Sequence, residues 1–392
     1  IKNIIGAGYT ALNQFSNAIN HYKAALKLEP KNAEVLNNLG LTFKAIGDFK
    51  KANECFENSI SIKPNFAEAF NNMALSLKEE RKFEKAIVSL EKAIALKNNY
   101  AEAYYNLGNV YNLLGELEKS INMFTRAIDI KSDYFDAYNN LGAVYNLKKD
   151  YDKAYQNIQK AISLNPNNAD AYNNLGTSAL NLNKEDEAIA HFNKAISIDP
   201  KLIIAYSNLC GLFEKSNNLK EFENILEKTK ELKLDQFGEI KFHEAQLLSR
   251  KKDFERSILL LKSIDDNEIS EKTKTNKYGL LGKDFDKVQN YKEAFKCFQK
   301  TNELVKVGVE YKQFNPTIYQ EEILELINSY SKAKKNSWMN YHQKLNFQPV
   351  FLVGFPRSGT TLLDTILSSH SNIITLEEKP MVAMVKMHLN KI

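Results

Sequence analysis

The chain has 392 residues, of which 43% are hydrophobic and 26% charged, the ordinary balance of a soluble globular protein. This length exceeds a single small core, so we expect more than one structural unit. The formal net charge of only +5, with lysines interspersed among glutamates, argues against nucleic-acid binding, and no apolar run is long enough for a membrane-spanning helix.

Residues 1–308 repeat with a period of 34. Five consecutive copies begin at Ala33, Ala67, Ala101, Phe135 and Ala169. Within each copy, positions 4, 7, 8 and 11 share one face of a helix, and positions 20, 24 and 27 form the stripe of a second helix. Each copy can bury its apolar stripe only against its neighbours, so the pattern predicts a mostly all-α solenoid of helix pairs.

Glycine and proline mark the ends of the expected helices. Gly47 and Gly115 follow the first helix of their copies as C-terminal caps, and Pro64, Pro166 and Pro200 end second helices. An incomplete copy opens the chain, and degenerate copies follow after about residue 203. The pattern resembles the tetratricopeptide repeat, and this resemblance implies that the first helices line the concave surface of a superhelix.

Position six is asparagine in six successive copies. These residues are Asn38, Asn72, Asn106, Asn140, Asn174 and Asn208. A carboxamide can both donate to and accept from a peptide backbone. The column resembles the asparagine ladder of the nucleocytoplasmic glycosyltransferase that carries such repeats, which implies an extended polypeptide or protein partner on the concave face. The alternative is a repeated consensus residue without a binding role in an asparagine-rich chain.

The repeat is lost at residues 309–347, where we expect a helical connector, and the chain then changes character. Residues 349–353 suit a buried parallel strand, the loop 354–361 follows, and apolar residues then recur at helical spacing. This order directs backbone N–H groups and a helix N-terminus at a phosphate. We therefore expect residues 348–392 to begin an α/β domain with a P-loop-like phosphate site.

The loop departs from the nucleotide-triphosphate P-loop at one place. Thr360 stands where that motif has lysine, and a cation comes earlier, at Arg357. A site for ATP hydrolysis would lack its main γ-phosphate contact. A site that holds one phosphate bearing a transferable group does not need that lysine.

The run from Phe355 to Leu363 resembles the 5′-phosphosulfate loop of sulfotransferases, which use 3′-phosphoadenosine 5′-phosphosulfate (PAPS) as co-substrate. The resemblance implies sulfuryl transfer to an acceptor hydroxyl without a metal. It implies that these residues surround the phosphosulfate: Arg357, Ser358, Gly359, Thr360 and Thr361. Arg357 would also offset the charge that develops on the bridging oxygen.

Glu378 is the candidate general base. It is the second member of an acidic pair after a short expected strand at residues 373–375, and tyrosylprotein sulfotransferases, which the region resembles, use a glutamate there. The alternative is a cap of the helix that begins near Pro380. Those enzymes continue with Thr-Arg where this chain has Lys379 and Pro380, so the acceptor stays open between protein tyrosine, carbohydrate and small metabolites.

The family's catalytic domain is longer than the segment present here, so we expect the chain to end inside it and the fragment to be inactive by itself. The competing interpretation is a protein-binding scaffold with a vestigial loop. Cys55, Cys210 and Cys297 have no paired spacing, which is typical of buried thiols in a reducing compartment, and we expect the cytoplasm. The histidines have no metal-ligand spacing.

Overall fold

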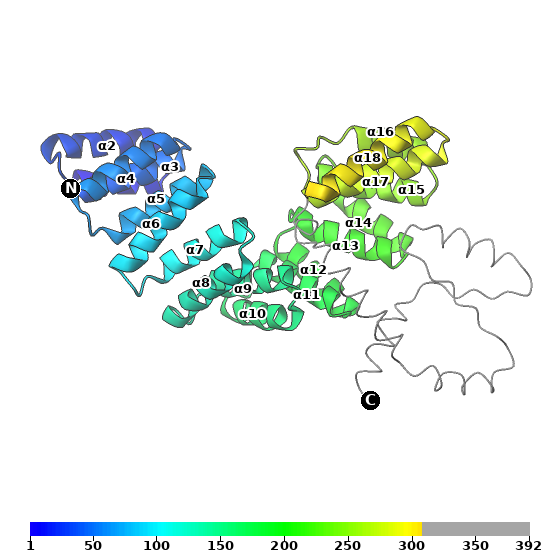
Figure 1. Cartoon of the computed structure of the whole chain (residues 1–392), viewed down its shortest axis with the longest axis horizontal. Helices are drawn as coiled ribbons and strands as arrows, with labels where there is room; N and C mark the ends of the chain where they lie inside the picture. The colour runs from blue at the N-terminus through cyan, green and yellow to red at the C-terminus, as the bar shows by residue number, and fades with distance from the viewer. Residues whose placement is uncertain (308–392) are drawn as a thin grey trace, which may run out of the picture. The chain divides into compact units, whose positions relative to one another are not determined.

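The computed structural model describes residues 1–307, and these form helices and no strand (Figure 1). The first helices of the successive pairs are α1 (Lys2–Ala11), α3 (Ala33–Ala45), α5 (Ala67–Glu79), α7 (Ala101–Leu113), α9 (Phe135–Leu147), α11 (Ala169–Asn181), α13 (Ile203–Lys215), α15 (Gly238–Arg250) and α17 (Glu271–Lys287). The second helices are α2 (Phe15–Leu28), α4 (Phe49–Ile62), α6 (Phe83–Leu96), α8 (Leu117–Ile130), α10 (Tyr151–Leu164), α12 (Glu185–Ile198), α14 (Leu219–Glu231), α16 (Phe254–Lys262) and α18 (Tyr291–Val307).

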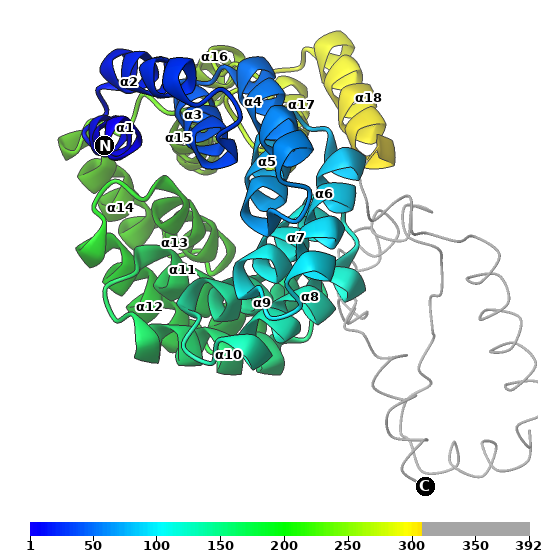
Figure 2. The same cartoon turned by 90° about the vertical axis from the view of Figure 1, so that its left-hand side faces the viewer.

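Each helix packs on the helices before and after it in the chain. First helices of neighbouring pairs also contact each other, whereas no two second helices are among the packed pairs of the described region. The first helices therefore lie on the tighter, inner side of the curved array, as Figure 2 shows for α5, α7 and α9. The predicted all-α solenoid is confirmed for residues 1–307. The connector and the expected α/β segment lie outside the described residues, and their boundaries stay predictions.

The predicted starts of the five regular copies coincide with the first residues of α3, α5, α7, α9 and α11. The predicted glycine caps are also confirmed. Gly47 and Gly115 have φ angles of +79° and +75°, a left-handed conformation that costs glycine little. Arg81 and Lys149 adopt the same conformation in other pairs, so the turn is kept even where the chain has no glycine.

The interior depends on small residues at position 8 facing large residues at position 24. A Cβ atom on Gly108 would lie 2.7 Å from the Phe124 ring, which is too close for any real contact. In the α5–α6 pair the two positions hold Ala74 and Leu90, and both are buried. A slightly larger first residue is thus matched by a smaller second one, and both pairs stay closely packed.

Position 3 is a second buried column, which the sequence analysis did not single out. Its residues are at most 2% exposed: Val35, Ala69, Ala103, Ala137, Ala171 and Ala205. The position-4 residues that were expected in the core, such as Tyr104 and Tyr138, are only half-buried. The buried face of these first helices therefore includes position 3, and in α13 it also includes Tyr206 at position 4.

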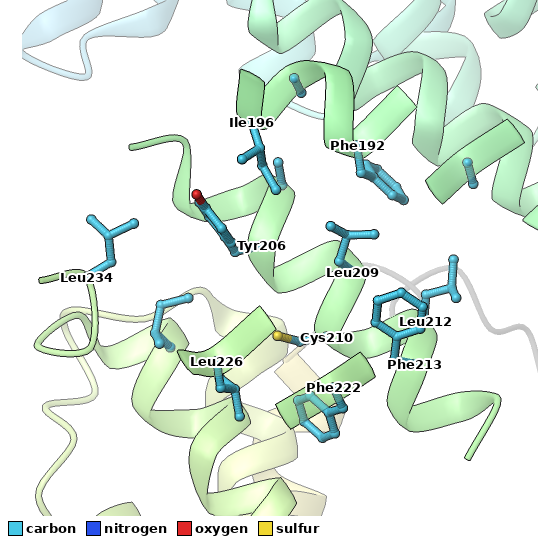
Figure 3. Close-up of a cluster of buried hydrophobic side chains, with 14 of the residues drawn as sticks. Phe192, Ile196, Tyr206, Leu209, Cys210, Leu212, Phe213, Phe222, Leu226 and Leu234 are labelled. Atoms are coloured by element: carbon cyan, nitrogen blue, oxygen red, sulfur yellow. The ribbon is translucent and has the colours of Figure 1, made fainter. Parts of the chain in front are cut away.

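The degenerate copies keep a buried core in two clusters, one around α13 and one from α15 to α18. Around α13, the side chains of Phe192, Tyr206, Leu209 and Phe222 pack with the Cys210 thiol between them (Figure 3). Cys55, Cys210 and Cys297 are all free and buried, so their predicted burial is confirmed. No helix within residues 1–307 combines the length and the apolar character needed to cross a membrane.

Candidate functional site

The position-six asparagines form one continuous column, which we call the asparagine ladder, on the first helices α3 to α13. The side-chain amide of each donates across the repeat boundary, and in five cases it donates to a position-five asparagine or its equivalent in the preceding first helix. The donor–acceptor pairs are Asn38–Asn3 at 3.1 Å, Asn72–Asn37 at 3.0 Å, Asn106–Asn71 at 2.8 Å, Asn174–Asn139 at 3.1 Å and Asn208–Asn173 at 2.8 Å.

The acceptors of the ladder are deeply placed. Asn37, Asn71, Asn139 and Asn173 are 6%, 1%, 9% and 5% exposed. A buried carbonyl oxygen needs a hydrogen-bond partner, and the ladder amide supplies it. The ladder therefore stabilises the contact between successive first helices. This role was missed from sequence, although the recurring Asn-Asn pairs at positions five and six were its visible signal.

Tyr105 interrupts the acceptor column in α7. Asn140 donates to the Tyr105 hydroxyl at 3.1 Å and to Oδ1 of Asn109 at 2.9 Å. The Tyr105 ring packs between Phe124 and Tyr134, with ring centroids 5.8 and 5.0 Å away. Burial raises the pKa of both tyrosine hydroxyls, so the Tyr105 hydroxyl accepts from Asn140 as a neutral group. The ladder thus continues through an aromatic cluster.

His243 ends the column in α15. Its Nε2 lies 2.7 Å from the Ser207 hydroxyl, and its Nδ1 lies 2.7 Å from Oε1 of Gln246. A carboxamide oxygen can only accept, so Nδ1 carries the proton and Nε2 accepts from Ser207. Burial lowers the pKa of His243 to about 4, against the opposing effects of the Gln246 hydrogen bond and the Glu239 charge. The imidazole is therefore neutral near pH 7.

Part of the ladder remains available to a ligand. Each ladder residue has a side-chain carbonyl oxygen, and each except Asn140 also has a second N–H beyond the bond described above. Five ladder residues are half-buried, whereas Asn106 is only 7% exposed. The structure thus brings the six predicted residues together on the inner side. Their contact with a peptide stays a prediction, and Asn106 has the least surface to offer.

The expected phosphosulfate residues Arg357, Ser358, Gly359, Thr360 and Thr361 lie outside the described residues, as does Glu378, and their roles stay predictions. Within residues 1–307 there is no group of His, Cys, Asp and Glu side chains that could hold a metal ion.

Family models match both parts of the chain. Models described as TPR or tetratricopeptide repeat match residues 6–47, 33–66, 76–115, 108–149 and 133–201. A model described as the sulfotransferase family matches residues 349–391, the region of the phosphosulfate-like loop.

Solved structures share the repeat architecture. A tetratricopeptide repeat protein from Parabacteroides merdae superposes with a TM-score of 0.55 at 19% identity and covers 64% of this chain and 98% of its own. PilW, a widely conserved type IV pilus biogenesis factor, gives a TM-score of 0.50 at 21% identity over 53% of this chain and 97% of its own. These likenesses show the fold alone.

An uncharacterized protein of Aquifex aeolicus (strain VF5) is 29% identical over 125 residues. The match spans 30% of this chain and only 15% of that relative. The chain thus carries tetratricopeptide repeats across its N-terminal region and, at residues 349–391, a segment that matches the sulfotransferase family.

Proposed function

We propose that this protein is a PAPS-dependent sulfotransferase whose repeats bind a protein substrate or partner. The observation that carries the proposal is the run from Phe355 to Leu363, which lies inside the segment that matches the sulfotransferase family. A loop with Arg357 before the second glycine, and with Thr360 in place of the P-loop lysine, suits one phosphosulfate better than a nucleoside triphosphate.

In this mechanism the loop binds the 5′-phosphosulfate through backbone N–H groups and the hydroxyls of Ser358, Thr360 and Thr361. Gly359 permits the close approach of the backbone. The acceptor oxygen forms a bond to sulfur while the bond from sulfur to the bridging oxygen breaks. Glu378 takes the acceptor proton, and Arg357 stabilises the charge left on the bridging oxygen. The products are the sulfated acceptor and 3′-phosphoadenosine 5′-phosphate.

The repeats would bind an extended polypeptide along the inner side, through the amide groups that the ladder leaves available. Protein tyrosine is the acceptor class that we favour, since a polypeptide held along the first helices would present its side chains. We place the protein in a reducing compartment such as the cytoplasm, because all three cysteines are buried and unpaired.

The catalytic part of the proposal is tested in the full-length protein by measuring binding of PAPS and, separately, sulfate transfer to a panel of acceptors. Arg357→Ala should lower turnover by about 100-fold or more. Glu378→Gln should abolish transfer and leave PAPS binding intact, because only the base is lost. Tighter binding of Mg²⁺-ATP than of PAPS would refute the sulfotransferase assignment.

The ladder's part is tested with a matched pair of variants, because truncating a ladder residue also breaks a structural bond. Asn174→Ala and Asn139→Ala remove opposite ends of the same 3.1 Å hydrogen bond, but only Asn174 is half-buried on the inner side. If the ladder contacts a peptide, Asn174→Ala should weaken binding of an extended polypeptide beyond the loss seen with Asn139→Ala. Equal losses would favour a ladder with a structural role alone.

A second candidate function is a protein-binding scaffold with a vestigial loop. The specific observation in its favour is that the described residues are repeats throughout, while the sulfotransferase match is confined to residues 349–391. A full-length protein that binds polypeptides but neither binds PAPS nor transfers sulfate would establish this alternative.

A further inference from the structure

A ring and a lysine recur on the second-helix side of the solenoid. The aromatic residue stands at position 11 of the first helix, and the lysine at position 19 begins the second helix. The pairs are Lys51 with Phe43 at 5.5 Å, Lys119 with Tyr111 at 5.3 Å and Lys153 with Tyr145 at 5.5 Å from nitrogen to ring centroid. Each ring fills the space between its own second helix and that of the preceding pair, and the ammonium group lies over it.

The α5–α6 pair lacks this ring. Leu77 stands at position 11, and among the described residues no ring lies beneath Lys85, the position-19 lysine. A hollow of about 530 Å³ opens at this place, lined by Leu77, Lys85 and Glu57 among others. Its walls come from α4 and α6 and its floor from α5, three helices that pack in succession (Figure 1).

The next pair shows what would fill the hollow. Tyr111, one period after Leu77, occupies the equivalent space. Burial and the Glu91 charge raise the pKa of the Tyr111 hydroxyl, and the Lys119 charge opposes them. Glu91 and Lys119 stand one period after Glu57 and Lys85. The hollow is therefore lined by a lysine and a glutamate at the positions equivalent to Lys119 and Glu91, and it lacks the ring.

The hollow has a small apolar patch among its charged and polar lining residues, made by Met73, Leu77 and Val88. Val88 on α6 is 65% exposed. The corresponding residues of α4, α8 and α10 are polar: Glu54, Asn122 and Gln156. A second hollow of about 530 Å³ adjoins the first and shares Met73 and Val88 with it. An incoming side chain would thus exchange water for apolar contacts on one face while its edge meets charged groups.

We propose that the hollow between α4 and α6 binds an aromatic side chain of a partner polypeptide, which takes the place that Tyr111 fills in the next pair. Tyrosine fits best. Its ring would lie beneath the Lys85 ammonium group, as the Tyr111 ring lies beneath Lys119 at 5.3 Å, and Glu57 lines the same hollow. This site lies between second helices, away from the ladder on the first helices, so it does not depend on the sulfotransferase assignment.

The test uses a short capped peptide, one 3-fluorotyrosine between two alanines, and fluorine NMR with the full-length protein. Wild type should bind at millimolar peptide. Leu77→Tyr fills the hollow from within and should abolish binding while the melting temperature is kept or raised. Lys85→Met keeps the aliphatic stem without the charge and should weaken binding about two- to fivefold. A peptide with leucine in place of tyrosine should compete poorly.

Tyr111→Leu is the reciprocal variant, and it keeps the proposal testable even if Leu77→Tyr does not fold. It should open an equivalent hollow beneath Lys119 and add a second binding site for the same peptide. Undiminished binding by a folded Leu77→Tyr variant would overturn the proposal. So would the absence of binding by wild type, or a Tyr111→Leu variant that gains no site.

Discussion

The regular pairs from α3 to α12 and the degenerate pairs from α13 to α18 differ in the polar side chains that connect neighbouring helices. In the regular pairs, neutral amides such as Asn72 and Asn37 connect successive first helices. In the degenerate pairs, ionisable groups take part in the contacts between neighbouring helices. His243 replaces a ladder asparagine, and Asp284 accepts hydrogen bonds of 2.6 Å from both Ser249 and Ser257.

A second ionisable connection supports the degenerate pairs. The ammonium group of Lys277, only 5% exposed, donates to the Ile264 carbonyl and to Asp266, both at 2.7 Å. Neutral amide pairs keep their strength at any moderate pH, whereas groups whose pKa is shifted by burial, such as His243 and Asp284, link folding to proton binding. The difference teaches that pH sensitivity should be concentrated in the C-terminal part of the solenoid.

The largest expected effect comes from His243. Its pKa is lowered to about 4 in the folded chain, against about 6.5 for an unfolded histidine. Between these values the unfolded chain binds the additional proton, so stability falls as the pH falls. The loss should amount to about 3 kcal/mol between pH 7 and pH 4. His243→Asn restores the ladder residue and should remove this share of the pH dependence, measured by urea denaturation at several pH values. If the free energy of unfolding falls equally with pH in the variant and in wild type, His243 is not the source of the pH dependence.

Gly108→Ala should destabilise the contact between α7 and α8 and lower the free energy of unfolding. The added Cβ would lie 2.7 Å from the Phe124 ring, and overpacking of this kind costs about 1–3 kcal/mol. Phe124→Leu in the same chain should recover most of the loss, because Ala74 and Leu90 are the natural counterpart in the α5–α6 pair.

Gly8→Ala is the control for that substitution, since nothing lies within 4 Å of the added atom on this helical glycine. It should stabilise the protein by about 0.5–1 kcal/mol through the lower backbone entropy of the unfolded chain. If both glycine variants change the free energy of unfolding equally, close packing at position 8 is not what selects glycine.

The ladder itself should contribute a smaller, pH-independent amount. Asn208→Ala removes the donor that lies 2.8 Å from Oδ1 of Asn173 and leaves that buried oxygen without this partner. The expected cost is about 1–2 kcal/mol in the free energy of unfolding, the same at pH 5 and pH 8. A pH-dependent cost would show that the amide ladder is coupled to a titratable group, which would weaken the contrast between the two regions.

Asp284→Asn should have the smallest effect at neutral pH. Burial raises the pKa of Asp284, while its hydrogen bonds to Ser249 and Ser257 act in the opposite direction. A raised folded-state pKa means that stability is lost as the pH rises through it, so the carboxylate is less favourable at pH 7 than at low pH. Asp284→Asn should therefore be at least as stable as wild type at pH 7. This advantage over wild type should shrink or reverse at acidic pH. If the variant has a lower melting temperature than wild type at pH 7 and a higher one at acidic pH, burial does not raise the pKa of Asp284.

The sequence alone determined the period, the helix starts and the positions of the caps, because these depend on local spacing and on the backbone preferences of residues such as Gly47 and Pro64. It also indicated the inner column of asparagines. It could not show that Asn72 donates to Asn37, because that bond depends on how far one helix is displaced along its neighbour. For the same reason, it could not show that position 3 is buried or that Nε2 of His243 lies 2.7 Å from the Ser207 hydroxyl.

The hollow beside Leu77 illustrates the same division. A leucine in place of an aromatic residue is an ordinary change within a repeat when it is read along the chain. Only the packed structure shows that a hollow stays open beside the buried Leu77, between α4 and α6, which are not among the packed helix pairs of the described region. The spacing of second helices is thus set by the first helices, and a missing ring leaves a space instead of a tighter contact.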